Sequence, residues 1–142
     1  MIKVELERVE GDYGFKAKDA ADHEVLFDSS MEHGGKNFGV RPMQSLLMAL
    51  GSCSGIDIVS ILKKQKQSFT SFRIIIEGER EDVKPISLWK IINVVFEFTG
   101  EVDEDKARKA CALSIEKYCS VAETLRRAGA DIHWTINVKA EG

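Results

Sequence analysis

The chain has 142 residues, of which 44% are hydrophobic and 30% charged, and it carries a formal net charge of −3. This length and composition predict a single globular domain, residues 1–142, that is large enough to bury a hydrophobic core. The charge balance argues against a nucleic-acid partner, since such binders usually present a strongly basic face. With only 2 prolines and 11 glycines, the chain is neither collagen-like nor a low-complexity sequence.

The amino-terminal residues carry charges throughout and lack the apolar segment of a secretory signal. Residues 46–62 are the most apolar stretch, but glycine and polar residues interrupt them. A membrane span needs about 20 mostly apolar residues, so this stretch predicts a buried helix. We therefore expect a cytoplasmic protein with no membrane partner. In that reducing compartment, cysteines are reactive or buried more often than they form structural disulfides.

In the first part of the chain, hydrophobic and polar residues alternate along residues 2–8, which predicts a half-buried strand. Two more short strands, through residues 15–17 and 24–28, complete a meander. Residues 29–39 form a polar loop, long enough to be functional or mobile. A long helix starts at Pro42, and its apolar residues lie on nearly all sides, so we expect it to be buried all round. A chain of this size has trouble wrapping such a helix, which hints at a second subunit.

In the second part, residues 71–80 and 88–99 are rich in β-branched and aromatic residues and predict two strands. Asp103 caps the next helix. A Ser-x-x-Glu capping box at Ser120 begins another, short one, and residues 132–138 alternate as the last strand. The order β-β-β-α-β-β-α-α-β contains no regular βαβ repeat. It predicts an α+β fold with mostly antiparallel sheets.

The cysteines carry the most chemical information. Cys53 lies between Gly51 and Gly55 in the long helix, where each glycine costs about 1 kcal/mol relative to alanine. Such a helix needs close backbone approach or room for a ligand. Cys119 precedes the capping box, where unpaired backbone N–H groups are expected to lower its thiol pKa. By position alone, each is either a reactive thiol or a buried core residue, whereas Cys111 on an alanine-rich face is core filler.

Metal and phosphate sites find no support in the sequence. The cysteines and histidines show none of the spacings typical of structural zinc sites, and Gly34-Gly35-Lys36 lacks the spacing of a phosphate-binding loop. We therefore predict neither a metal nor a cofactor.

Two segments resemble a known family. Residues 41–62, which contain Cys53, closely resemble the central helix of the OsmC/Ohr family, and residues 113–121 resemble its second-cysteine motif. Glu79-Arg80, Pro85 and Gly100 fall where the OsmC-like branch usually has them. The resemblance spans nearly the whole chain. It implies an intertwined homodimer, with antiparallel sheets around two long central helices and two sites at the subunit interface.

The resemblance also implies a thiol peroxidase that reduces organic hydroperoxides. By motif, Cys53 matches the peroxidatic cysteine and Cys119 the resolving cysteine. The resemblance then implies a sulfenic acid on Cys53 that condenses with Cys119 to a disulfide. A dithiol, a lipoylated protein or a thioredoxin-like partner would return the pair to thiols.

The chain departs from the family's peroxidases at two positions. Those enzymes pair the reactive cysteine with an arginine from the amino-terminal region and a glutamate at the start of the central helix. Gln44 stands at the glutamate position, and Arg41 is the candidate substitute for the arginine, or else an exposed helix-end residue. Asp57, one turn after Cys53, is a further candidate for a supporting role, as a partner of a cation.

These departures predict a slow peroxidase and leave two other functions open. One is a non-catalytic protein that binds a small apolar ligand beside Gly51 and Gly55. The other is a redox sensor, in which the Cys53–Cys119 disulfide alters a contact with a partner.

Overall fold

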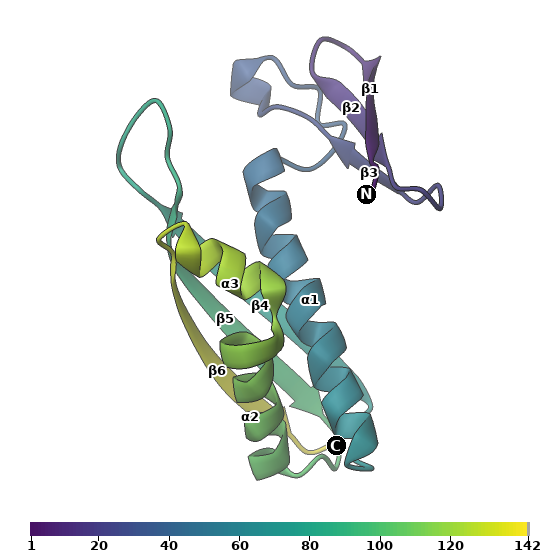
Figure 1. Cartoon of the computed structure of the whole chain (residues 1–142), viewed down its shortest axis with the longest axis vertical. Helices are drawn as coiled ribbons and strands as arrows, with labels where there is room; N and C mark the ends of the chain where they lie inside the picture. The colour runs from purple at the N-terminus through teal and green to yellow at the C-terminus, as the bar shows by residue number, and fades with distance from the viewer. Residues whose placement is uncertain (142) are drawn as a thin grey trace. The chain divides into compact units, whose positions relative to one another are not determined.

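The computed structural model describes residues 1–141. The chain forms two compact units, of which the first ends at Leu46 and the second begins at Leu47. Its elements follow the predicted order β-β-β-α-β-β-α-α-β, so the α+β class is confirmed (Figure 1). A single domain over residues 1–142 stays a prediction.

The first unit contains a three-stranded antiparallel sheet in the order β1-β2-β3. This confirms the meander. The prediction of a half-buried first strand is wrong, because every residue of β1 is exposed in this chain. A strand is half-buried only where a second layer covers one of its faces. The strands are β1 (Glu5–Glu10), β2 (Gly14–Lys18) and β3 (Glu24–Phe27).

The polar loop after β3 is held by one carboxylate. Asp28 is buried, and its side chain accepts hydrogen bonds from the backbone N–H groups of Ser29 (2.7 Å), Lys36 (2.8 Å) and Phe38 (3.1 Å). These bonds, that of Lys36 first, keep the pKa of Asp28 below its usual value. Within the loop lies a short 3-10 helix, η1 (Met31–His33). Both ends of the loop are therefore tied to the same side chain.

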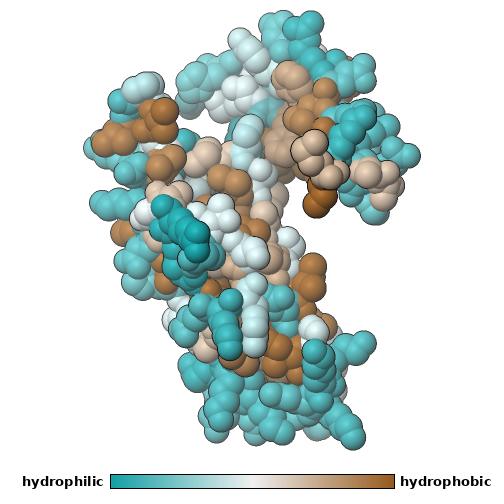
Figure 2. Space-filling model, viewed as in Figure 1, coloured by the Kyte–Doolittle hydropathy of each residue, from teal (hydrophilic) through white to brown (hydrophobic). Residues whose placement is uncertain are grey.

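The long helix α1 (Pro42–Lys64) begins at the predicted proline. The single chain does not bury it on nearly all sides, because Met48 is 53% exposed and Ile56 is 71% exposed, and its burial by a second subunit stays a prediction. Apolar residues are visible on the molecular surface in Figure 2. By length and composition alone, α1 could cross a membrane, a test that core helices of soluble proteins also pass. Its buried residues are Leu50, Gly51, Ser54, Ile58 and Leu62.

The second unit contains a three-stranded sheet in the order β4-β5-β6. Strands β4 and β5 pair antiparallel, as expected for a fold with mostly antiparallel sheets, whereas β5 and β6 pair parallel. The parallel pairing follows from the connection, because α2 and α3 carry the chain back across the sheet before β6. The elements are β4 (Ser71–Arg80), β5 (Trp89–Thr99), α2 (Glu104–Leu113), α3 (Ser120–Arg127) and β6 (Asp131–Lys139).

The core of this unit lies between the sheet and its helices, which Figure 1 shows in front of the sheet. Alternate residues of β5 point into it and are fully or almost fully buried. The rings of Phe72 on β4 and Phe98 on β5 stack with centroids 4.4 Å apart. The buried residues of β5 include Ile92, Val94, Phe96 and Phe98.

The glycines beside Cys53 let α1 approach β4 closely. A Cβ atom added at Gly55 would lie 2.9 Å from the Cδ1 atom of Ile74, and one added at Gly51 would lie 3.1 Å from that of Ile76. Real Cβ contacts are rarely this short. Close backbone approach, one of the two explanations expected from the sequence, is therefore confirmed, and it fixes the part of α1 that carries Cys53.

Candidate functional site

The structure brings Cys53 and Cys119 together. Cys53 lies half-buried in the middle of α1, and Cys119 lies directly before α3, only 3% exposed. Their thiols lie close enough for Cys53 to affect the pKa of Cys119. Both are free thiols in this structure, as is Cys111. The two cysteines singled out by the sequence therefore form one site with unequal access to solvent.

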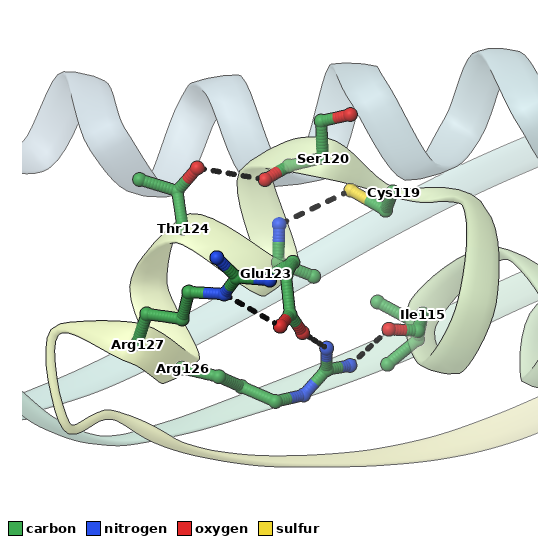
Figure 3. A network of polar contacts seen from close by, with 8 residues as sticks. Ile115, Cys119, Ser120, Glu123, Thr124, Arg126 and Arg127 are labelled. Atoms are coloured by element: carbon green, nitrogen blue, oxygen red, sulfur yellow. Dashed lines mark hydrogen bonds and ion pairs between the residues drawn. The ribbon is translucent and has the colours of Figure 1, made fainter.

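Cys119 caps the amino terminus of α3 with its own sulfur. Its backbone is extended (φ −76°, ψ 105°), and its Sγ atom accepts a hydrogen bond from the N–H of Ala122 at 3.4 Å (Figure 3). The prediction that Ser120 is the cap is therefore wrong by one residue. Ser120 is already helical, and its carbonyl accepts a hydrogen bond from the Thr124 hydroxyl at 2.8 Å.

Burial raises the pKa of the Cys119 thiol to about 11. The N–H of Ala122 acts in the opposite direction, and the contact with Cys53 adds to the rise. The expected lowering by the helix terminus is therefore wrong, because desolvation of a thiolate outweighs one weak hydrogen bond to sulfur.

A wide helical turn places Cys119 in this position. Between α2 and α3 the chain forms a π-helical turn, η2 (Ser114–Tyr118), in which the N–H of Cys119 donates to the carbonyl of Ser114 at 2.7 Å. No feature of the sequence predicted this turn. Such turns are often found at functional sites, but no residue preference in this segment marks one.

Two arginines of α3 bind Glu123, and one of them, Arg126, also reaches the turn (Figure 3). Arg126 donates to the carbonyl of Ile115 and to Glu123, the latter at 3.1 Å. Arg127 also donates to Glu123, at 3.0 Å. The hydrogen bonds from Arg127 and then Arg126 lower the pKa of Glu123. Arg126 therefore connects the π-turn to the helix that Cys119 caps.

Ser114 connects the same turn to α1. Its buried hydroxyl lies 3.1 Å from the carbonyl oxygen of Ser54 and 3.1 Å from Oδ2 of Asp57, and it donates toward both. Asp57 thus accepts a hydrogen bond close to the cysteine pair. Its pairing with a cation stays a prediction.

Three further residues singled out in the sequence are Arg41, Gln44 and Cys111. Arg41, in the first unit, is half-buried, and its Nη1 atom donates to the carbonyl of Gly39 at 3.0 Å. Gln44 is exposed in the first turn of α1. The roles of both in supporting Cys53 stay predictions. Cys111 is fully buried in α2, as expected of a core residue, and burial raises its pKa to about 12.

The site is suited to thiol chemistry. Two neighbouring thiols, one of them accessible, can take part in thiol–disulfide exchange, in which a thiolate attacks a disulfide sulfur. Among residues 1–141, no group of three or more histidine, cysteine or acidic residues could hold a metal ion.

The sequence model of the OsmC family, described as OsmC-like protein, matches residues 33–135, and the chain belongs to this family. Protein YhfA of Escherichia coli K12 is 40% identical over 115 residues, which cover 80% of this chain and 82% of YhfA.

Two solved structures share the fold of this chain. A hypothetical protein from Aquifex aeolicus VF5 superposes with a TM-score of 0.85 at 30% identity, over 100% of this chain and 98% of that one. OhrB, the organic hydroperoxide resistance protein of Bacillus subtilis, superposes with a TM-score of 0.60 at 14% identity, over 98% of each chain. At that low identity OhrB shares the fold, and the OsmC-like fold expected from the sequence is confirmed.

Proposed function

We propose that this protein is a thiol-dependent peroxidase that reduces organic hydroperoxides. The observation that supports the proposal is the proximity of the thiols of Cys53 and Cys119, of which Cys53 is the more accessible one. OhrB, which is named an organic hydroperoxide resistance protein, has the same fold and supports the substrate class.

In the first step, the Cys53 thiolate attacks the terminal oxygen of the hydroperoxide. An S–O bond forms and the O–O bond breaks, so the sulfur is oxidised to a sulfenic acid and the peroxide is reduced. The leaving alkoxide takes up a proton and departs as an alcohol.

In the second step, the sulfur of Cys119 attacks the sulfur of the Cys53 sulfenic acid. An S–S bond forms, the S–O bond breaks, and water leaves with the proton of Cys119. An external dithiol, lipoylated protein or thioredoxin-like protein then supplies two electrons and two protons and restores both thiols. No cofactor is needed for these steps.

We propose that turnover is slow. Gln44 cannot supply the carboxylate that the family's peroxidases use to orient an arginine, and the guanidinium of Arg41 is bonded to the Gly39 carbonyl of its own loop. A cation fixed beside a thiolate stabilises it, and these two departures remove the pair that does so in the family's peroxidases.

The test is steady-state consumption of cumene hydroperoxide or tert-butyl hydroperoxide with dithiothreitol as reductant. Cys53→Ser should abolish consumption above the uncatalysed rate, and Cys119→Ser should let a sulfenic acid accumulate that dimedone traps. Cys111→Ser is the matched control, since Cys111 is a third free thiol that lies in the core. Equal rates for the wild type and Cys53→Ser would rule the mechanism out. A disulfide without turnover would indicate a redox sensor instead.

We also propose that the protein is a cytoplasmic homodimer in which α1 lies at the interface. The exposed side chains of Met48 and Ile56 on α1 support this, since apolar residues on one helix face are usually covered. Light scattering after size-exclusion chromatography should give twice the chain mass for the wild type and a smaller mass for Ile56→Arg. A monomeric wild type would refute the dimer.

A groove beside α1 favours a second candidate function, the binding of a small apolar ligand. The groove has a volume of about 590 Å³, and its walls come from α1 and β4. Native mass spectrometry of protein purified from cells should then detect a bound molecule. Its absence would count against this candidate. The apolar lining residues are Gly51, Gly55, Ile56, Val59, Phe72 and Ile74.

A further inference from the structure

Ser114 links the backbones that carry the two cysteines. Its carbonyl accepts the N–H of Cys119 at 2.7 Å, and its hydroxyl donates toward the carbonyl of Ser54, the residue next to Cys53, at 3.1 Å. The same hydroxyl lies 3.1 Å from Oδ2 of Asp57, one turn further along α1. Two successive hydrogen bonds through one residue therefore run from Cys119 to the backbone beside Cys53.

We propose that Ser114 is a positioning residue that sets how readily Cys53 and Cys119 form a disulfide. This inference rests on the proposed function, because it assigns a role in the same thiol pair. Ser114 touches neither a substrate nor a reacting sulfur. It acts by holding the π-turn, and with it Cys119, against α1.

The contacts of the turn divide into two sets with different consequences. The bonds of Arg126 to Ile115 and of Ala122 to Cys119 connect the turn and the cap to α3. The hydroxyl of Ser114 connects the turn to α1, which carries the other cysteine. Loss of this hydroxyl therefore loosens one sulfur relative to the other, while the turn itself keeps its bonds to α3.

Burial makes the contact effective. Ser114 and Ser54 are both fully buried, so water does not compete for their hydrogen bonds. A disulfide forms only when the two sulfurs meet in a narrow range of positions. The net strength of one protein hydrogen bond corresponds to about threefold to tenfold in an equilibrium constant. We expect a change of that size in disulfide formation when the hydroxyl is removed.

Ser54→Ala is the matched control. Ser54 is a fully buried serine next to Cys53, but its hydroxyl donates only within α1, to the carbonyls of Leu50 (2.8 Å) and Gly51 (3.2 Å). Replacement by alanine keeps the Ser54 backbone carbonyl that Ser114 uses. The two variants thus lose the same group at the same depth, and one of them loses the link between the cysteines.

The experiment measures the thiol–disulfide equilibrium of the pair in buffers of reduced and oxidised glutathione. In this exchange, oxidised glutathione takes two electrons and two protons from the two thiols and becomes two reduced glutathione molecules. Free thiols are alkylated, and mass spectrometry quantifies the Cys53–Cys119 disulfide. Ser114→Ala should lower the equilibrium constant for the protein disulfide about threefold to tenfold, and Ser54→Ala less than about twofold. Urea unfolding of the reduced proteins shows whether both variants are folded.

A conservative variant separates the hydroxyl from the volume of the side chain. Ser114→Thr keeps the hydroxyl and should recover most of the wild-type equilibrium constant even if its extra methyl group lowers stability. If Ser114 affected stability alone, the equilibrium constant for the disulfide would instead fall in proportion to the unfolding free energy in Ser114→Ala, Ser54→Ala and Ser114→Thr.

The outcomes also separate this proposal from the peroxidase function. Suppose that the wild type forms the disulfide, and that Ser114→Ala and Ser54→Ala change its equilibrium constant equally or not at all. The role of Ser114 is then refuted and the peroxidase proposal stands. If the predicted shift is found but no hydroperoxide is consumed, the role of Ser114 stands and the peroxidase proposal fails. A wild type that forms no Cys53–Cys119 disulfide with glutathione or a hydroperoxide overturns both.

Discussion

Arg126 donates a hydrogen bond to the carbonyl of Ile115, the acceptor that the N–H of Cys119 would use in an uninterrupted α-helix. The N–H of Cys119 instead bonds to Ser114, one residue earlier, and this widens the turn. Arg126 thus satisfies the carbonyl that the wide turn leaves free, as a buried backbone group requires. The chain then leaves the helix at Cys119, whose sulfur caps α3 and contacts Cys53.

Removal of the Arg126 side chain should destabilise the protein. Arg126→Gln loses the bond to Ile115, and an unpaired carbonyl next to the core costs about 1–3 kcal/mol of unfolding free energy. Urea denaturation of the reduced protein measures this. Arg127→Gln is the control, because Arg127 has the same partner, Glu123, but its side chain is 81% exposed against 29% for Arg126. The control should change stability by less than about 0.5 kcal/mol, and equal losses in the two variants would refute the role of Arg126.

Alkylation should distinguish the two site cysteines by their exposure and pKa. At pH 8, a thiol with a pKa of about 11, as burial gives Cys119, is ionised in only about one molecule in a thousand. Iodoacetamide should therefore modify Cys53 first and Cys119 far more slowly, with the Cys119 rate rising about tenfold per pH unit up to about pH 11. Peptide mass spectrometry after timed quenching follows each site. Faster modification of Cys119 than of Cys53 at pH 8 would contradict the burial described.

Stability should fall in alkaline solution because of the buried thiols. Burial raises the pKa of Cys111 to about 12, whereas in the unfolded chain a thiol ionises near pH 8.5–9. Between about pH 9 and 12 the folded state holds a proton that the unfolded state has lost, so unfolding becomes easier as the pH rises. Each such thiol contributes at most about 1.4 kcal/mol per pH unit. Cys111→Ala should make the slope of unfolding free energy against pH shallower, whatever its effect at pH 7. An unchanged slope would show that Cys111 contributes nothing to it.

The loop after β3 should loosen when Asp28 loses its charge. Asp28→Asn weakens the hydrogen bonds to the N–H groups of Lys36 and Phe38, whose amides should exchange with deuterium faster than in the wild type. The pKa of Asp28 is lowered in the folded protein. As the pH falls, the wild-type loop should therefore keep these hydrogen bonds until about pH 4, the usual carboxyl range, and loosen only at lower pH. Asp12→Asn, at an exposed turn, should leave these amides unchanged. Unchanged exchange rates of these amides in Asp28→Asn would show that the Asp28 carboxylate does not hold the loop.

Much of the fold could be predicted from local pattern. The β-branched run that became β4, the proline that begins α1 and the aspartate that caps α2 each act through their nearest neighbours. The side chain of Asp103 accepts the N–H of Lys106 at 2.9 Å, as a capping residue should. Such signals lie within a few residues of the structure they specify, so they can be read without knowing the rest of the chain.

Other predictions failed where a distant part of the chain decides the outcome. The strand β1 has the alternation of a half-buried strand yet is exposed, because its burial depends on a layer that the alternation does not specify. Cys119 stands before a helix terminus that should lower its pKa, but the pKa is raised because burial there is the larger effect. Burial is a property of the whole packed unit, which local spacing does not contain.

By itself, the sequence determined which cysteines to consider and the elements that carry them, because periodicity, capping residues and motifs are short-range properties. Only the tertiary structure decided that the two thiols lie close together, that a π-helical turn precedes Cys119, and that Ser114 connects that turn to α1. These contacts join residues far apart in the chain. They exist only once α1 and the turn pack together. Exclusion of water there strengthens the hydrogen bonds of Ser114 and raises the pKa of the Cys119 thiol.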